Sequence, residues 1–170
     1  MQLLAGLEAL QSIPRNAAVS IGNFDGVHLG HRKLIEHARS HGSPVVLITF
    51  EPHPLTVLKP ALAPPRLSRA DEKRDLLEKL GVQWLIELPP EPAVLNLSAR
   101  EFWDRLMRDA KPGWVIEGDT FAFGKGREGD VNQLKIWAAQ SGVALEVIES
   151  EKAPLLDMLL APVSSSLSCP

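Results

Sequence analysis

The sequence predicts an α/β fold, with a parallel sheet of about five strands and helices on both of its faces. Short apolar runs alternate with segments of helical periodicity, which is the pattern of consecutive βαβ units. The run VVLITF at 45–50 is apolar throughout and rich in β-branched residues, as is typical of an inner strand of a parallel sheet. A length of 170 residues is enough for one domain with a sizeable core, so a single domain over 1–170 is expected.

The first helix is predicted over 30–40 from the spacing of its apolar residues. Leu34, Ile35 and Ala38 share one face of this helix, whereas its charged residues, Lys33 among them, point away from that face. An amphipathic helix of this kind is expected to pack on a sheet through its apolar face.

Prolines and capping residues mark most of the remaining boundaries. Five prolines in 51–66 predict a segment without regular structure, because proline lacks the backbone N–H that helices and strands use. Ser68 with Asp71, and Ser98 with Glu101, are predicted to cap the amino termini of two helices. The other expected elements are, in chain order, a strand over 17–21, a helix over 69–80, a strand over 83–88, a helix over 99–109, a strand over 114–118, a glycine-rich loop over 119–129, a helix over 130–141 and a strand over 144–150.

The composition and the net charge limit the kinds of molecule that the protein is expected to bind. The net charge is -3 and tyrosine is absent, so neither a basic field nor a stacking platform for nucleic acid is expected. Cys169 is the single cysteine, which excludes an internal disulfide framework and a cysteine-rich zinc site. Residues 1–16 make a poor signal peptide, and no apolar stretch approaches the roughly 20 residues that span a bilayer. The sequence therefore predicts a cytoplasmic protein with small-molecule substrates and makes no prediction about its oligomeric state.

The unusual stretches of the sequence each follow a predicted strand. They are GNFDGVHLGH at 22–31, TFEPHP at 49–54 and GDTFAFGKGREGD at 118–130. Because the carboxyl ends of parallel strands meet at one edge of the sheet, these three stretches are expected to meet there and to form a ligand site.

The first of these stretches has the features of a phosphate site. Gly22 and Gly26 allow a positive φ or a close approach of the backbone to a ligand. His28, Gly30 and His31 stand where the helix begins, so unpaired N–H groups and the positive end of the helix dipole face the same place. The two histidines are predicted to donate hydrogen bonds to a phosphate and to stabilise charge that develops on phosphorus, rather than to attack it.

Two other interpretations of these motifs are disfavoured. A zinc site made of His28, His31, His37 and His41 fails because the last two lie well beyond the first turn of the helix. The segment 124–129 spells the G-x-G-x-x-G of dinucleotide-dependent oxidoreductases.

That oxidoreductase fingerprint requires a strand directly before its first glycine. The predicted strand 114–118 ends several residues earlier, and Asp130 would place a negative charge beside the pyrophosphate. Glu149, about 20 residues on, is the only other feature that favours the oxidoreductase interpretation.

At the level of motifs the chain resembles a known family. GNFDGVHLGH at 22–31 looks like the H-x-G-H signature of the nucleotidylyltransferase superfamily. Together with TFEPHP at 49–54, the leucine-rich segment at 67–82 and FGKGREGD at 123–130, it resembles the FAD synthetase (FMN adenylyltransferase) module of bacterial bifunctional riboflavin kinase/FAD synthetases. The resemblance runs from about residue 15 to about residue 166, with the motifs in the family's order.

The resemblance implies a Rossmann-like fold and the transfer of AMP from ATP to FMN, which gives FAD and pyrophosphate with Mg²⁺. It implies direct displacement by the FMN phosphate, without a nucleophile on the protein. Phe121 and Phe123 alternate, so one is expected to face a ring and the other the core. His53 is expected either to face the flavin or the phosphates or to have a purely structural role. Asp25 either shapes the loop or caps a turn. The implied residues are His28 and His31 for catalysis, Gly22, Asn23, Phe24, Asp25, Gly30, Ser164, Ser165 and Ser166 for the nucleotide, and His53, Phe121, Phe123 and Lys125 for the flavin, with no residue expected to bind a metal.

The sequence departs from the family near its end. The second signature of the superfamily, roughly I-S-S-T-x-x-R, is represented by VSSSLSCP at 163–170, with Cys169 in the place of the arginine. No Arg or Lys follows Lys152, and the riboflavin kinase module that usually follows is absent. The alternatives are therefore a flavin- or nucleotide-binding module with impaired or no catalysis, a module with a substitute cation such as Lys125 or Arg127, and another small-molecule nucleotidylyltransferase.

Overall fold

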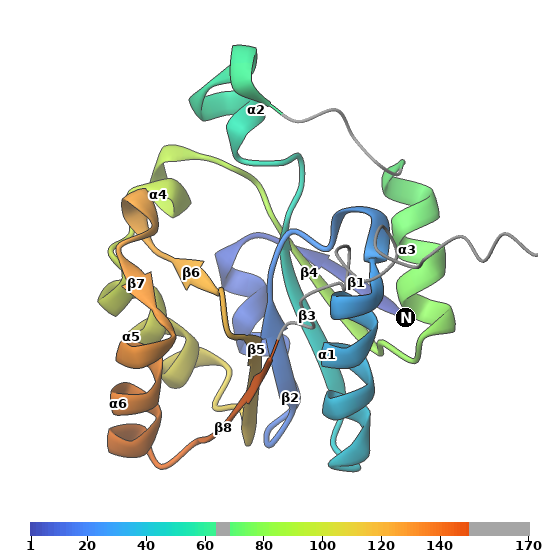
Figure 1. Cartoon of the computed structure of the whole chain (residues 1–170), viewed down its shortest axis with the longest axis vertical. Coiled ribbons are helices and arrows are strands. Elements are labelled where there is room, and N and C mark those ends of the chain that lie inside the picture. Colours follow the sequence, from blue (N-terminus) through green and yellow to red (C-terminus); the bar gives the residue numbers. More distant parts are fainter. Residues whose placement is uncertain (64–68, 150–170) are drawn as a thin grey trace, which may run out of the picture.

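The structure is a computed structural model that describes residues 1–63 and 69–149. Its centre is a six-stranded sheet in which every neighbouring pair of strands is parallel (Figure 1). Across the sheet the strands are β1 (Gln2–Ala5), β4 (Trp84–Leu88), β3 (Val45–Phe50), β2 (Ala18–Ile21), β5 (Trp114–Gly118) and β8 (Ala144–Ile148). The α/β class and the parallel sheet predicted from the sequence are confirmed.

The sheet has one strand more than the five expected. β1 lies at the edge, where it pairs with β4 in the register Gln2↔Trp84 and Leu4↔Ile86. Its sequence, QLLA, has no β-branched residue and is mostly exposed, so it carries none of the signals that mark an inner strand. Pairing with β4 creates this strand, and the local sequence does not predict it.

Two pairs of helices cover opposite faces of the sheet (Figure 1). α1 (Leu29–Ser40) and α3 (Ala70–Lys79) cover one face, and α5 (Ala99–Asp109) and α6 (Val131–Ser141) cover the other. Alternate residues of β3 divide between the two cores. Leu47 packs with Ile35 of α1 and Leu77 of α3, whereas Ile48 packs with Trp103 of α5.

The caps of α3 and α5 differ in how well the sequence predicts them. Ser98 caps α5 as predicted, because its Oγ accepts a hydrogen bond from the backbone N–H of Glu101. The predicted cap of α3 is shifted by one residue. Arg69 is the N-cap, and its backbone N–H donates to the carboxylate of Glu72 at 3.0 Å.

Short elements occupy segments that the sequence left irregular. The proline-rich segment contains α2 (Leu55–Leu58) and a 3-10 turn at Pro60–Leu62, because a proline at the first turn of a helix loses no hydrogen bond. The prediction of no regular structure there is corrected to this extent. The remaining short elements are 3-10 turns at Leu7–Ser12, Asp25–Val27 and Lys125–Arg127, the helix α4 (Pro92–Leu95), and the hairpin strands β6 (Ala122–Phe123) and β7 (Gly129–Asp130).

The order of the strands reverses between β2 and β5. From β2 the chain builds outward through β3 and β4 on one side and later through β5 and β8 on the other. β2 and β5 pair only at Ala18↔Trp114 and Val19↔Val115, so their carboxyl ends separate. A crevice at this point is the usual ligand site of an open parallel sheet. Among the described residues, no helix is long and apolar enough to cross a membrane.

Candidate active site

A pocket of about 690 Å³ opens at the carboxyl edge of the sheet, between the ends of β2 and β5. The amino terminus of α1 forms one wall, with His28, Gly30 and His31. Residues that follow β5 form another wall, among them Asp119 and Phe121. The pocket thus brings together the loop after β2 and the loop after β5, two of the three stretches that the sequence placed at one edge.

The loop after β2 has an unusual backbone. Phe24, Gly26 and Val27 have φ angles of 48°, 65° and 39°, in the left-handed region that residues with a side chain rarely adopt. Both side chains of the non-glycine residues are buried in the core under α1, with Phe24 0% exposed. Phe24, predicted to line the nucleotide site, contributes its buried ring mainly to this core, although the residue also borders the pocket.

His28 and His31 stack on one another at the start of α1. Their ring centroids lie 3.6 Å apart at an interplanar angle of 25°. A Cβ on Gly30 would come within 3.1 Å of the His28 ring, so glycine leaves room for the ring in this position. The structure therefore places both predicted catalytic histidines together at the wall of the pocket.

His31 is held in its neutral form. Its pKa is lowered to about 4, first by burial, then by the charges of His28 and Lys73, against an opposing contribution from Asp25. Its ring also lies 5.0 Å from the ring of Phe24, and its Nδ1 has no hydrogen-bond partner within 1–63 and 69–149. A neutral imidazole donates one hydrogen bond and adds no positive charge next to the stacked ring of His28.

The amino terminus of α1 offers further donors. His28 is the N-cap, and no side chain of the described residues caps the helix. The first backbone N–H groups of a helix have no partner within the helix, and they lie at the positive end of its dipole. The start of α1 therefore has the donors and the field that bind an anion such as a phosphate.

Glu117 is a buried acid of the pocket that the sequence analysis missed. It is 1% exposed, and its Oε1 accepts a hydrogen bond of 2.7 Å from the backbone N–H of Ile21. This contact joins β5 to β2 just beyond the last paired residues, where the two strands separate. Burial raises the pKa of Glu117 well above its usual value, against an opposing contribution from the hydrogen bond of Ile21, so burial favours the protonated carboxyl. The sequence contains one signal that could have identified this residue, because a glutamate stands within the otherwise apolar run WVIEG.

Lys33 also lies at the pocket. The sequence analysis predicted that Lys33 points away from the apolar face of the helix, but it did not place this residue at the site. The spacing of apolar and charged residues predicts which face of a helix is charged. It does not predict whether that charged face borders bulk solvent or a polar pocket.

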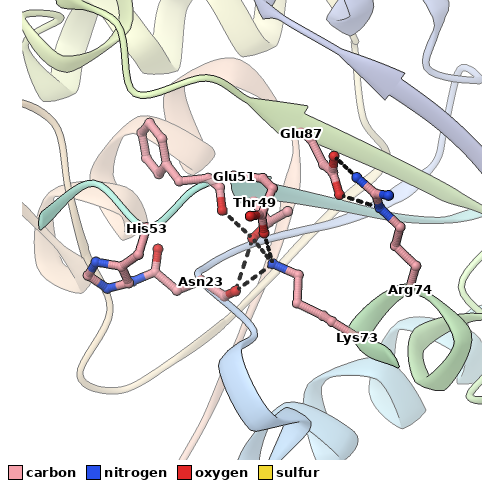
Figure 2. Close-up of polar contacts among 8 residues, drawn as sticks. Asn23, Thr49, Glu51, His53, Lys73, Arg74 and Glu87 are labelled. Carbon is pink, nitrogen blue, oxygen red and sulfur yellow. Dashed lines mark hydrogen bonds and ion pairs between the residues drawn. The ribbon is translucent and has the colours of Figure 1, made fainter. Parts of the chain in front are cut away.

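The loop after β3 meets the loop after β2 through two side chains. Nε2 of His53 lies 3.0 Å from the carboxamide nitrogen of Asn23 (Figure 2). Nδ1 of His53 accepts the backbone N–H of Leu55 at 3.1 Å. The predicted nucleotide residue Asn23 and the predicted flavin residue His53 are thus neighbours. Neither is among the residues that line the pocket between β2 and β5.

The other residues predicted to bind flavin separate into three environments. Phe121 lines the pocket, and its ring stacks on that of Phe123 at a centroid distance of 5.2 Å. Phe123 is buried and packs with Phe102 and Trp137 in the core, as expected for one member of the pair. That Phe121 faces a ligand ring stays a prediction. The side chain of Lys125 is exposed on the turn between β6 and β7 and is not part of the pocket.

Two of the three glycines of GKGREG, Gly124 and Gly129, serve packing, whereas Gly126 has open space around it and a φ of 64°. A Cβ on Gly124 or on Gly129 would collide with Ala99 at the start of α5. Asp130 caps α6 by accepting the N–H groups of Asn132 and Gln133. These contacts explain the two packed glycines without a dinucleotide, as the sequence analysis expected.

The histidines of the rejected zinc site lie at two ends of α1. His37 and His41 each contact one carboxylate oxygen of Glu146, at 2.9 and 3.0 Å, and His41 stacks on Trp114. Within the described residues no group of three potential metal ligands is present.

Part of the predicted site lies outside the described residues. Ser164, Ser165 and Ser166, together with the position of Cys169, fall in 150–170.

Comparisons with a family model and with curated proteins point to the same family. A family model described as FAD synthetase matches residues 10–155. A bifunctional riboflavin kinase/FMN adenylyltransferase of Escherichia coli (strain K12) is 38% identical over 136 residues, which are 76% of this chain and 44% of that protein. The protein of the same name from Pseudomonas fluorescens is 32% identical over 173 residues, covering 99% of this chain and 55% of its own length. The chain spans about half the length of the curated relatives it matches.

Solved structures share the fold. A protein titled macrolide-efflux protein from Streptococcus pneumoniae aligns with a TM-score of 0.75 at 21% identity, over 88% of this chain and 52% of that chain. A pantoate-beta-alanine ligase from Francisella tularensis aligns with a TM-score of 0.61 at 16% identity, over 91% of this chain and 69% of that chain. At these identities the likeness shows the fold alone, and it agrees with the expected Rossmann-like architecture.

Proposed function

The chain belongs to the FAD synthetase family, and from that premise we propose that it transfers AMP from ATP to FMN, giving FAD and pyrophosphate. The observation that carries the proposal is the stacked pair of His28 and His31 at the amino terminus of α1, at the wall of a pocket of about 690 Å³. Histidine donors beside an uncapped helix start suit the binding of a polyphosphate.

The proposed reaction is a direct displacement. An oxygen of the FMN phosphate attacks the α-phosphorus of ATP, and a new P–O bond forms while the bond to the bridging oxygen of the β-phosphate breaks. Pyrophosphate leaves with the electron pair of the broken bond. Reactions of this type depend on positioning and charge stabilisation, so no nucleophile on the protein is required.

Each group at the helix start has a role in this scheme. The first N–H groups of α1 and the ring N–H groups of His28 and His31 donate to phosphate oxygens as negative charge shifts to the leaving pyrophosphate. Because His31 has a pKa of about 4, it acts as a neutral donor at physiological pH. Burial raises the pKa of Glu117, which favours the uncharged carboxyl and so reduces repulsion of the triphosphate.

We propose that Mg²⁺ enters with ATP. The described residues offer no group of three potential metal ligands, whereas Mg²⁺ commonly keeps several waters and binds through substrate phosphates. When bound, Mg²⁺ supplies neutralisation of phosphate charge.

Phe121 is the proposed contact for an aromatic ring of a substrate. It is the member of the Phe121–Phe123 pair that borders the pocket, and offset stacking between flat rings is favourable. His53 is proposed to act indirectly, because it holds the carboxamide of Asn23 at 3.0 Å.

The test is an incubation of the purified chain with FMN, ATP and Mg²⁺, in which FAD and pyrophosphate are separated by chromatography. Formation of both products in equal amounts supports the proposal. If no FAD forms while calorimetry detects saturable binding of ATP, the chain is a nucleotide-binding module without turnover, which is the alternative raised by the missing arginine signature. FMN replaced by riboflavin, which has no phosphate to attack, is the matched control.

A further inference from the structure

Lys73 is a buried lysine of α3 that lies behind the loop carrying His28 and His31. It is 5% exposed. Its Nζ lies 3.2 Å from the carbonyl oxygen of Asn23, 3.2 Å from Oγ1 of Thr49 and 3.5 Å from Oε2 of Glu51 (Figure 2). The ammonium therefore joins α3, the loop after β2 and the end of β3, three segments that are distant in the sequence.

The carbonyl of Asn23 is held twice. Oγ1 of Thr49 donates to the same oxygen at 3.0 Å while it accepts from Nζ of Lys73. Thr49 is 1% exposed. Movement of this carbonyl would take one of three acceptors from the buried ammonium and the nearer of two acceptors from the buried hydroxyl, which costs free energy. The contacts therefore fix Asn23, the second residue of the loop after β2.

The loop beyond Asn23 requires such an anchor. Phe24 and Val27 have φ angles of 48° and 39°, and non-glycine residues persist in this region only where the surroundings hold them. Their buried side chains hold the loop on the side of α1, and the hydrogen bonds to Asn23 hold it at the end of β3.

Packing does not explain a lysine at this position. Leu77, one turn later on the same face of α3, is fully buried in the apolar core. An apolar residue at position 73 would extend that packing, whereas burial penalises the ammonium and lowers the pKa of Lys73. The carboxylate of Glu51 is 3.5 Å away, a longer contact than the two bonds of 2.9 and 2.6 Å that neighbouring Arg74 makes with Glu87. The shorter contacts of Lys73 are those that lead to the loop.

We propose that Lys73 is a positioning residue of the phosphate-binding loop, which fixes Asn23 and thereby sets the stacked pair of His28 and His31 for adenylyl transfer. Its catalytic consequence rests on the proposed function. Its structural consequence, the placement of His31, does not.

Lys73 also acts on His31 through its charge. The pKa of His31 is lowered by burial first, then by His28 and Lys73, and is raised by Asp25. The acidic groups that act on Lys73 itself are Glu51, Glu87 and Asp25. Removing the charge at position 73 is therefore expected to raise the pKa of His31 from about 4 toward its ordinary value.

The experiment compares Lys73→Met, Lys73→Arg and the control Lys79→Met, an exposed lysine on the same helix. Steady-state kinetics give kcat and KM for ATP, and NMR follows the imidazole titration of His31, with its signals assigned from a His31→Gln sample. Lys73→Met is expected to lower kcat about 10²-fold, a typical cost of misplacing catalytic groups by about 1 Å, with a smaller change in KM. It is also expected to raise the pKa of His31. Lys73→Arg restores most of both properties, and Lys79→Met matches the wild type.

The outcomes separate this proposal from the proposed function. A Lys73→Met protein that keeps the wild-type kcat and the wild-type His31 titration overturns the positioning role. If the wild type makes no FAD, the proposed function fails, and the His31 titration is then measured in Thr49→Val, which removes a donor to Asn23 without changing a charge. An unchanged titration in that variant overturns the positioning role. If Lys73→Met does not fold, Thr49→Val removes the second donor to Asn23, and unchanged kcat and unchanged ATP affinity in that variant overturn the proposal.

Discussion

The proposed chemistry of the site depends on the pair of His28 and His31, whose rings stack at 3.6 Å. Two imidazolium rings at that distance would repel one another, and the lowered pKa of about 4 for His31 avoids this. One ring is therefore neutral near pH 7, and each can still donate a hydrogen bond to a phosphate oxygen.

Replacing His28 with alanine is expected to lower adenylyl transfer by about 10²- to 10³-fold, the usual cost of removing one donor to a developing charge. His28 is exposed, so the free energy of unfolding should change by about 0.5 kcal/mol or less. Initial rates of FAD formation and urea unfolding measure the two effects.

His37→Ala is the matched control, because His37 lies on the same helix and pairs with Glu146 away from the pocket. It should keep the wild-type rate. Equal losses in both variants would mean that the defect is general and that His28 has no special role.

Glu117 gives a prediction about pH and stability. Its pKa in the folded protein is raised by burial, so above the ordinary value of 4.5 the unfolded chain releases a proton that the folded chain keeps. Stability therefore falls as pH rises from about 4.5 toward the folded pKa, and Glu117→Gln removes this loss while its amide oxygen still accepts from Ile21. Melting temperatures should rise in the variant at pH 8 and change little at pH 4.5.

An exposed glutamate of α1, Glu36, provides the comparison for this titration. Glu36→Gln should leave the pH dependence of melting unchanged. If Glu117→Gln also leaves it unchanged, Glu117 is not a neutral buried acid.

At the scale of elements, the β6–β7 hairpin is held against the start of α5 by two glycines. Gly124 has a φ of 77°, and a Cβ there would collide with Ala99, whereas Gly126 has a φ of 64° and open space around it. The hairpin places Phe123 in the core and leaves Phe121 at the pocket. Close packing of this hairpin therefore shapes one wall of the pocket.

Alanine substitution separates backbone strain from packing in this hairpin. Gly126→Ala should lower the free energy of unfolding by about 1 kcal/mol, the cost of a positive φ alone. Gly124→Ala should cost roughly 1 to 3 kcal/mol more, because overpacking adds to the strain. Urea denaturation measures both, and equal losses would contradict the packing role of Gly124.

The ends of the elements show where local sequence is sufficient. The box of Ser98 and Glu101 was predicted and is present, since both partners lie within four residues. The corresponding box at α3 starts at Arg69 rather than Ser68, because Glu72 pairs with the backbone N–H of Arg69. A choice between adjacent caps depends on the surroundings of the helix, which the local sequence does not contain.

At the scale of the whole molecule, the pocket joins the two halves of the sheet, so ligand binding should stabilise the entire fold. ATP at 100 times its Kd is expected to add about 2.7 kcal/mol to the free energy of unfolding. For a chain of 170 residues this corresponds to an increase in Tm on the order of 5–10 °C. Differential scanning calorimetry across an ATP series measures it, and a Tm that stays constant over that series would contradict a nucleotide site in the folded chain.

The sequence by itself determined the α/β class, five of the six strands and the four main helices, because apolar periodicity and caps are local signals. It also determined that His28, Gly30 and His31 stand together at a helix start, since they lie within four residues of one another. The sequence analysis set the GKGREG motif apart from a dinucleotide site because the predicted strand 114–118 ends several residues earlier. That reason was wrong, since β6 (Ala122–Phe123) lies directly before Gly124, and the close approach of Gly124 and Gly129 to Ala99 is what accounts for these two glycines.

Only the tertiary structure decided what depends on contacts between distant segments. β1 exists through its pairing with β4, Lys33 borders a pocket rather than bulk solvent, and Phe121 differs from Phe123 because the core takes one of the two rings. Lys73 and Glu117 become informative only when folding buries their charged groups against Asn23 and Ile21. Burial and long-range hydrogen bonding set the protonation and position of such groups, and neither is encoded in the spacing of neighbouring residues.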